Sequence, residues 1–313
     1  MQQPEPYGRR APMAALMRPP RPVAPAHLPA SQDVGGEAPL ADTISPANFQ
    51  RLARHINSHT GIMLPPSKTI MMEGRLRRRV RELGMESIDS YCQWMFSTGS
   101  LLAETPHLIN LATTNKTDFF REPKHFDYLA RTVLPAMAKR GQASLRAWSA
   151  ACSTGAEPYT MAMVMDDFAL RAGLPRYSIL ATDIDTNVLE TAQRGIYPTP
   201  LLAPVPAMLR QRYVMDAKDP LRGECRIIPR LRAAISFARM NLMDATYGVG
   251  EPMDVIFCRN VLIYFDKETQ NRVLTRLVDQ LKPGGHLFLG HSEALPAIGL
   301  PVKQVGSTTY QRD

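Results

Sequence analysis

The chain has 313 residues, enough for two ordinary domains or one large domain with a sizeable core. Hydrophobic residues make up 44% and charged residues 21%, which excludes wholesale disorder and a fibrous protein. Lys and Arg number 37 against 29 Asp and Glu, and the net charge of +8 suggests an anionic partner: nucleic acid, a membrane surface or an acidic protein face.

The cysteines favour a reducing compartment. All four are far apart, with no C-x-x-C pair and no histidine at ligand spacing, which argues against a zinc site and a disulfide scaffold. No apolar run approaches the ~18 residues of a membrane helix, and the apolar patch at 14–17 is too short for a signal peptide. We therefore expect a cytoplasmic protein without membrane insertion.

The chain begins with a segment of no periodicity. Residues 1–42 are rich in Pro, Ala and Gly and carry four arginines, which predicts a disordered basic tail. A small helical domain is expected over 43–114. It opens with Ser45 as N-cap, Pro46 at the first helical position, and Ile44 and Phe49 as a hydrophobic staple. The apolar spacing predicts helices at 46–60, 69–83, 88–96 and 100–112.

After about residue 143 the pattern alternates between strand and helix. Strands are predicted at 145–149, 177–181, 234–238, 253–258 and 286–289, with helices after the first, second and fourth of them. This alternation predicts an α/β fold, with a parallel sheet covered on both faces, over 124–313. Residues 198–232 interrupt it with several prolines and a possible hairpin near 219–223, which indicates a small inserted subdomain.

Candidate site residues follow the strands, because ligands of doubly wound sheets bind at the strands' carboxyl ends. The turn at 153–157 has one glycine and ends in Glu157, so it does not suit a pyrophosphate. Asp183 ends the second strand, where an acid usually binds ribose hydroxyls. Arg259 and Asn260 end a buried strand, and Tyr264 lies close behind. A nucleoside ligand without a pyrophosphate, such as S-adenosylmethionine, fits this pattern best.

A further cluster lies between the two predicted domains, in a linker at 115–123. Two aromatic residues, Phe119 and Phe120, stand there among the polar side chains of Asn115, Thr117 and Arg121. This composition is common in binding sites. Each cluster also has a purely structural interpretation. The segment 153–157 could be an ordinary turn, 259–264 a capped strand with a core tyrosine, and 115–123 a solvated linker.

Together the motifs at 115–122, 151–159, 182–185, 257–265 and 290–293 resemble the CheR family of chemotaxis receptor methyltransferases, over roughly residues 44–311. The resemblance implies an all-α domain followed by a Rossmann-like S-adenosylmethionine-dependent methyltransferase domain with an inserted antiparallel β-subdomain. It implies methylation of glutamates on receptor signalling helices. The cofactor contacts carried over are Asn115, Thr117, Arg121, Glu157, Asp183, Asn241, Leu242, Arg259 and Asn260, with Arg121 and Tyr264 placing the methyl group and the acceptor carboxylate.

The sequence departs from the family pattern in two places. Ala156 stands where many members have a second glutamate. Members that dock on a receptor C-terminal pentapeptide share a glycine-rich loop, whereas 215–223 holds one glycine here, so a pentapeptide tether is not favoured.

A glutamate carboxylate is already anionic at neutral pH and needs no general base, so alignment and water exclusion are the expected tasks of the enzyme. This agrees with the lack of a catalytic triad or a metal-ligand set in the sequence. Five arginines crowd residues 75–81, and like charges four apart repel, so we expect Arg75, Arg78 and Arg79 to recognise acidic receptor helices.

Three alternatives stay open. The arginine face could be merely solvated. The chain could also methylate nucleic acid. Methyltransferases that act on amino groups of bases usually have prolines after the fourth strand, and the segment Cys258-Arg-Asn-Val has none. We therefore expect no nucleic acid as a partner. It could also be a non-catalytic sensor that binds a nucleotide in the same pocket.

Overall fold

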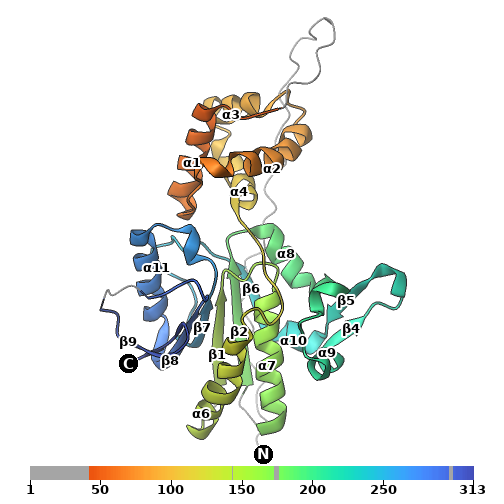
Figure 1. Cartoon of the computed structure of the whole chain (residues 1–313), viewed down its shortest axis with the longest axis vertical. Helices are drawn as coiled ribbons and strands as arrows, with labels where there is room; N and C mark the ends of the chain where they lie inside the picture. The colour runs from red at the N-terminus through yellow and green to blue at the C-terminus, as the bar shows by residue number, and fades with distance from the viewer. Residues whose placement is uncertain (1–41, 143, 173–175, 296–298) are drawn as a thin grey trace, which may run out of the picture.

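The computed structural model describes residues 42–142, 144–172, 176–295 and 299–313, so the predicted tail lies outside the described residues except for Asp42. The first part is a helical unit over residues 44–112 (Figure 1). Its elements are α1 (Pro46–Thr60), η1 (Pro66–Lys68), α2 (Thr69–Glu82), α3 (Ile88–Ser97) and α4 (Leu101–Ala112), which confirms the four predicted helices.

The predicted start and end of α1 are both confirmed. The Ser45 hydroxyl accepts the N–H of Asn48, and Ile44 and Phe49 are buried in the same core cluster. Gly61 ends the helix in the left-handed conformation, with φ of 72°. These local signals fix where the helix ends, which matters because that end reaches the candidate site.

The second part is an α/β unit built on a seven-stranded sheet. Its strand order is β6-β2-β1-β7-β8-β10-β9. The first five strands in that order run parallel, and β10 pairs antiparallel with both β8 and β9. The strands are β1 (Ser144–Ala150), β2 (Arg176–Asp183), β6 (Ile235–Arg239), β7 (Met253–Cys258), β8 (Leu281–Leu289), β9 (Val302–Gly306) and β10 (Thr309–Arg312).

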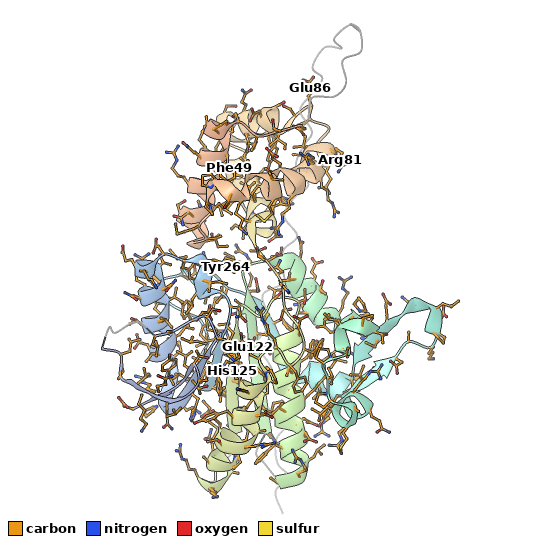
Figure 2. All side chains as sticks on the ribbon, viewed as in Figure 1. Phe49, Arg81, Glu86, Glu122, His125 and Tyr264 are labelled. Carbon is orange, nitrogen blue, oxygen red and sulfur yellow. The ribbon has the colours of Figure 1, made fainter. Side chains whose placement is uncertain are left out.

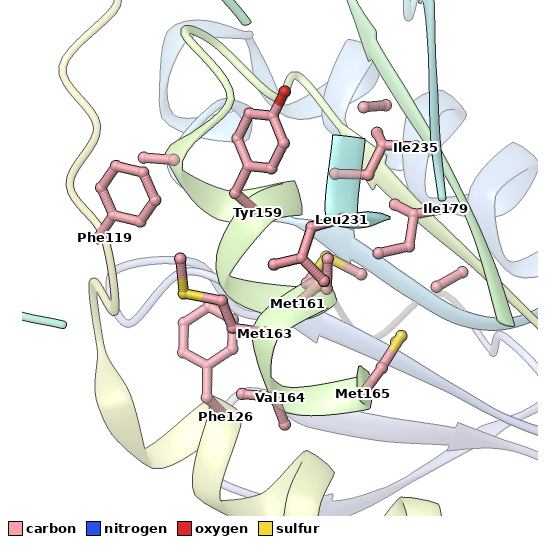
Figure 3. Close-up of a cluster of buried hydrophobic side chains, with 14 of the residues drawn as sticks. Phe119, Phe126, Tyr159, Met161, Met163, Val164, Met165, Ile179, Leu231 and Ile235 are labelled. Carbon is pink, nitrogen blue, oxygen red and sulfur yellow. The ribbon is translucent and has the colours of Figure 1, made fainter. Parts of the chain in front are cut away.

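Alternating side chains of the sheet enter two cores. On β1, Ala147 belongs to one core cluster and Trp148 to the other. Figure 3 shows the first cluster, where Met161 and Met165 of α7 lie among apolar side chains that include Ile179 of β2. The covering helices are α5 (Pro123–Tyr128), η2 (Leu129–Val133), α6 (Leu134–Lys139), α7 (Ala156–Ala172), α8 (Thr186–Arg194), α10 (Pro229–Ala233) and α11 (Lys267–Asp279). Burial on both faces confirms the predicted α/β class.

The predicted insertion is a small antiparallel sheet of order β3-β5-β4, which projects from the side of the α/β unit (Figure 1). The hairpin expected near 219–223 joins β4 to β5 through η4. Tyr197 anchors the insertion, since its buried ring packs edge-on against Phe119 at 5.1 Å. The elements are β3 (Ile196–Pro198), η3 (Thr199–Leu202), α9 (Ala207–Tyr213), β4 (Val214–Asp216), η4 (Pro220–Arg222) and β5 (Glu224–Ile227).

The two units are joined at defined contacts. The Asn110 amide donates to the Thr186 hydroxyl and accepts the N–H of the same residue. At the end of α1, the N–H of Met63 donates to the carbonyl of Tyr264 at 3.0 Å. A Cβ on Gly61 would lie 2.8 Å from the Met243 sulfur, so only glycine allows this close approach. Among the described residues, no helix has the length and apolarity to cross a bilayer.

Candidate functional site

A pocket lies where the carboxyl ends of the parallel strands face the helical unit. The space between its walls is about 990 Å³, open solvent included. The helical unit contributes Thr60 and Ile62, so both units form the wall. All ten cofactor and catalytic residues predicted from the sequence line it: Asn115, Thr117, Arg121, Glu157, Asp183, Asn241, Leu242, Arg259, Asn260 and Tyr264.

The backbone around this pocket is strained. Five non-glycine residues adopt positive φ angles there: Phe120 (53°), Glu122 (56°), Ala151 (63°), Ser153 (51°) and Asn260 (58°). Such a conformation costs about 1–3 kcal/mol per residue and persists only where the surroundings enforce it. The strain is concentrated after β1 and β7 and in the linker before α5, which supports a functional role for this edge of the sheet.

Asp183 is a buried carboxylate at the end of β2. Its oxygens accept the N–H of Ser153 at 2.8 Å and of Asp185 at 3.0 Å. Burial raises the pKa of Asp183 to about 6, although these backbone hydrogen bonds oppose the shift. A carboxylate that is desolvated yet faces a pocket is suited to accept hydrogen bonds from ligand hydroxyls.

Asp185 instead holds the linker against the strand end. It caps α8 by accepting the N–H groups of Asn187 and Val188. Its other oxygen accepts the Thr113 hydroxyl and the Asn115 amide, both at 2.7 Å. The Asn115 side chain thus has a structural partner within the pocket wall.

Arg259 is the buried centre of the site. Its side chain is 2% exposed and pairs with Glu122 at 2.8 Å and with Glu157 at 3.1 Å. Burial raises the pKa of Glu157, with the Arg259 charge opposing it. For Glu122, burial is outweighed by hydrogen bonds from Arg259 and by its charge, which lower the pKa to about 2. The charge of Arg259 is therefore already neutralised by the protein.

Asn260 is held in its strained conformation by Glu293. The two Glu293 oxygens accept four backbone N–H groups, at 2.7–2.9 Å. The donors are those of Asn260, Val261, Leu262 and Gly290. A Cβ on Gly290 would lie 2.5 Å from the Asn260 amide nitrogen, so the loop after β8 closes directly over the loop after β7.

Arg121 and Tyr264 are half-buried residues of the pocket wall. In the described part of the chain, Arg121 forms no ion pair with a carboxylate, and its guanidinium donates to the Lys116 carbonyl at 2.8 Å. Tyr264 lies at the end of η5 (Leu262–Tyr264), on the side of the α/β unit that faces the helical unit (Figure 2). Asn241, just after β6, spans the gap between the units by donating to the carbonyl of His59 at 2.6 Å.

The predicted receptor-binding arginines lie on α2, outside the pocket. Arg79 forms hydrogen bonds at 2.9 and 2.5 Å to Glu104, a carboxylate only 1% exposed, and Arg75 donates to the carbonyls of Leu111 and Thr113. Both arginines therefore have partners inside the helical unit, and their role in receptor binding stays a prediction. Arg78 is different, because its side chain is 83% exposed and, among the described residues, forms a hydrogen bond and ion pair with Glu82 alone.

Sequence reasoning did not assign roles to Glu122, Glu293, Thr60 or Ile62. Both glutamates stand inside motifs recognised in the sequence, and an acid beside a strand-end motif is a signal for a supporting partner. Thr60 and Ile62 carry no such signal, because only the docking of the two units brings them to the pocket.

The chemistry of the wall fits S-adenosylmethionine. Asp183 suits the ribose hydroxyls, and the buried acids disfavour a polyphosphate. Charged wall residues are balanced, which suits a ligand with a sulfonium, an ammonium and a carboxylate. They are Lys116, Asp118, Arg121, Glu157, Asp183 and Arg259.

Comparisons with known proteins agree with this fit. Residues 47–113 match the family model "CheR methyltransferase, all-alpha domain", and residues 115–311 match "CheR methyltransferase, SAM binding domain". A chemotaxis protein methyltransferase of Salmonella typhimurium is 41% identical over 267 residues, 85% of this chain and 90% of that protein. Chemotaxis protein methyltransferase 2 of Pseudomonas aeruginosa is 39% identical over 84% of this chain and 92% of that protein. The Escherichia coli chemotaxis protein methyltransferase is 40% identical over 85% and 91%.

Proposed function

We propose, from the premise that the chain belongs to the CheR methyltransferase family, that it methylates glutamate side chains of chemotaxis receptors in the cytoplasm. The chain is a chemotaxis-type methyltransferase whose cofactor is S-adenosylmethionine. The finer proposal concerns the acceptor: receptor glutamates, which become methyl esters.

The observation that carries this proposal is the contrast between the two arginines of the pocket. Arg259 is buried and neutralised by two glutamates, whereas Arg121 is a half-buried wall residue with a backbone carbonyl as its partner. A guanidinium with free donors binds a carboxylate in two parallel hydrogen bonds. Arg121 is therefore the group that can orient a carboxylate beside Tyr264.

The described wall residues include no histidine or cysteine, and a carboxylate acceptor requires no base. When bound, S-adenosylmethionine supplies an electrophilic methyl group on its sulfonium. Asp183 would hold its ribose hydroxyls, while Arg259, fixed by Glu122 and Glu157, keeps the loop after β7 in place. Thr60 and Ile62, at the end of α1, line the pocket, where they would help to exclude water and so strengthen the alignment of two oppositely charged reactants.

For receptor recognition we retain Arg78, the exposed arginine of α2, as a contact for acidic methylation helices. Arg75 and Arg79 act there by holding α2 against α4. Reversal of charge in Arg78→Glu should weaken receptor methylation and leave binding of S-adenosylhomocysteine unchanged. Equal loss of both would contradict a docking role.

The direct test is incubation of the full chain with methyl-labelled cofactor and a receptor cytoplasmic fragment, followed by mass mapping of alkali-labile esters. Arg121→Ala should lower kcat/KM by about 10- to 100-fold, since a charge-assisted hydrogen bond contributes about 1.5–3 kcal/mol. Arg131→Ala, an exposed arginine outside the pocket, is the control.

Calorimetry with S-adenosylhomocysteine then separates two roles of Arg121. If Arg121→Ala binds S-adenosylhomocysteine as tightly as the wild type, Arg121 acts on the acceptor carboxylate. If the loss of this affinity matches the loss of kcat/KM, Arg121 acts on the cofactor carboxylate. Normal turnover by Arg121→Ala, or label that appears in no glutamate ester, would overturn the proposal.

A further inference from the structure

A cluster of three side chains lies beside the pocket, on the far side of Arg259. Glu122 and His125 stand at the start of α5, where Figure 2 shows them close together, and His291 follows β8. The Oε2 atom of Glu122 is 3.5 Å from Nδ1 of His125 and 4.0 Å from Nε2 of His291. One ligand atom from each residue lies within 4.8 Å of the other two.

The hydrogen bonds of His125 fix its tautomer. The Thr308 hydroxyl donates to the carbonyl of Leu289, so its oxygen can only accept from the ring. Nε2 of His125 lies 3.0 Å from that oxygen and 3.2 Å from the carbonyl of Ser307. With two acceptors around it, Nε2 must carry the proton, and Nδ1 is left with a lone pair.

That lone pair has no hydrogen-bond donor among the described groups, although the His125 side chain is only 2% exposed. It faces the Glu122 carboxylate, which is a second acceptor. Two acceptors at 3.5 Å repel each other unless a cation lies between them, and they are too close for a water molecule to bridge with two ordinary hydrogen bonds.

We propose that Glu122, His125 and His291 bind a divalent transition metal of the Zn²⁺ class, and that the bound metal inhibits methyl transfer. Two ligand atoms of a tetrahedral Zn²⁺ site lie about 3.4 Å apart, close to the 3.5 Å between Nδ1 and Oε2. Two imidazoles and one carboxylate are a common three-ligand set for this metal and leave a fourth position for water. His291, 47% exposed, gives the metal access from solvent. The Nε2–H hydrogen bond to Ser307 is the outer contact that orients a metal-bound histidine.

Inhibition follows from the shared oxygen. Oε2 of Glu122 accepts the Arg259 guanidinium at 2.8 Å, so a divalent cation on the same atom weakens that ion pair and repels the arginine. Glu157 alone then balances the charge of Arg259. The hydrogen bond from the Asn260 amide to the same Glu122 carboxylate is weakened as well, although Glu293 still holds the backbone of that loop. The proposed inhibition rests on the proposed function, whereas the proposed metal binding does not.

The test uses the full chain without an affinity tag, titrated with Zn²⁺ by calorimetry and with Co²⁺ by visible absorption. His291→Ala removes an exposed ligand. His125→Gln removes the Nδ1 lone pair and keeps a donor toward Ser307. His59→Ala is the matched control, because His55 and His59, with ring centroids 4.3 Å apart on α1, could chelate a metal on their own.

We expect one Zn²⁺ per chain at this site in the wild type and in His59→Ala, and affinity at least about tenfold weaker in the other two variants. Zn²⁺ should lower methyl transfer in the wild type and in His59→Ala, reversibly with a chelator, and much less in His291→Ala. Equal uptake by His291→Ala and His59→Ala, or equal inhibition of both, would overturn the proposal. Turnover without metal tests the proposed function separately.

Discussion

Binding of S-adenosylhomocysteine, the demethylated form of the cofactor, should depend on pH because of Asp183. Burial raises the pKa of this carboxyl to about 6 in the ligand-free chain. A ribose hydroxyl that donates to Asp183 favours the ionised form, because a protonated carboxyl has lost acceptor capacity. Affinity for S-adenosylhomocysteine should therefore be full above pH 7 and fall as the pH drops through 6.

The size of the effect follows from that pKa. Roughly one site in ten is ionised at pH 5, so the apparent Kd should rise about tenfold between pH 7.5 and pH 5. Calorimetric titration across this range measures it. The matched variant, Asp183→Asn, should bind about 10- to 100-fold more weakly at pH 7.5 and lose most of the pH dependence. What remains would report Glu157, whose pKa burial also raises.

The stability of the ligand-free chain should respond in the opposite direction. An acid with a folded pKa near 6 and an ordinary value of 3.8 binds more protons when folded. The free energy of unfolding should therefore fall by about 3 kcal/mol as the pH rises from about 4 to 6.

Two binding results would refute the role assigned to Asp183. One is a wild-type Kd for S-adenosylhomocysteine that stays constant between pH 7.5 and pH 5, and the other is an equal pH dependence of this Kd in Asp183→Asn.

Two further predictions concern unfolding in urea. Arg79→Ala should lower the free energy of unfolding by about 3–5 kcal/mol because Glu104 stays buried without its cation, whereas Arg78→Ala should change it by less than about 0.5 kcal/mol. Equal values for the two would show that the buried pair does not stabilise the helical unit. Glu293→Gln should cost about 3 kcal/mol or more, since an amide group then faces two of the four N–H donors; an unchanged midpoint would contradict this.

Local patterns predicted most of the fold. Caps and apolar spacing placed α1 to α4, and the apolar runs placed the parallel strands. The helices over 123–139 were missed, since a π-helical segment, Leu129–Val133, interrupts them. The β9–β10 hairpin was missed because its pairing with β8 is a long-range contact of polar, partly exposed strands. Strand β8 begins at Leu281 rather than His286, passing through the Pro-Gly-Gly stretch.

Residues at strand ends, such as Asp183 and Arg259, were predicted as pocket residues, and both line the pocket. The role of the α2 arginines could not be predicted, because the partner of Arg79 lies on another helix, 25 residues away. The same limit hid the approach of Glu122, His125 and His291, since the sequence separates His291 from the other two and only the packing of α5 against the loop after β8 unites them.

The shared wall of the pocket has a consequence for how such proteins can be recombined. Thr60 and Ile62 reach the cavity from one unit and the strand-end residues from the other, with Gly61 fitted against Met243 between them. In a chimaera that carries the helical unit of a relative, the residues at positions 60 and 62 would therefore not match the rest of the pocket wall. Receptor specificity would thus not transfer freely between relatives, because the helical unit that we propose to meet the receptor also completes the pocket for the methyl donor.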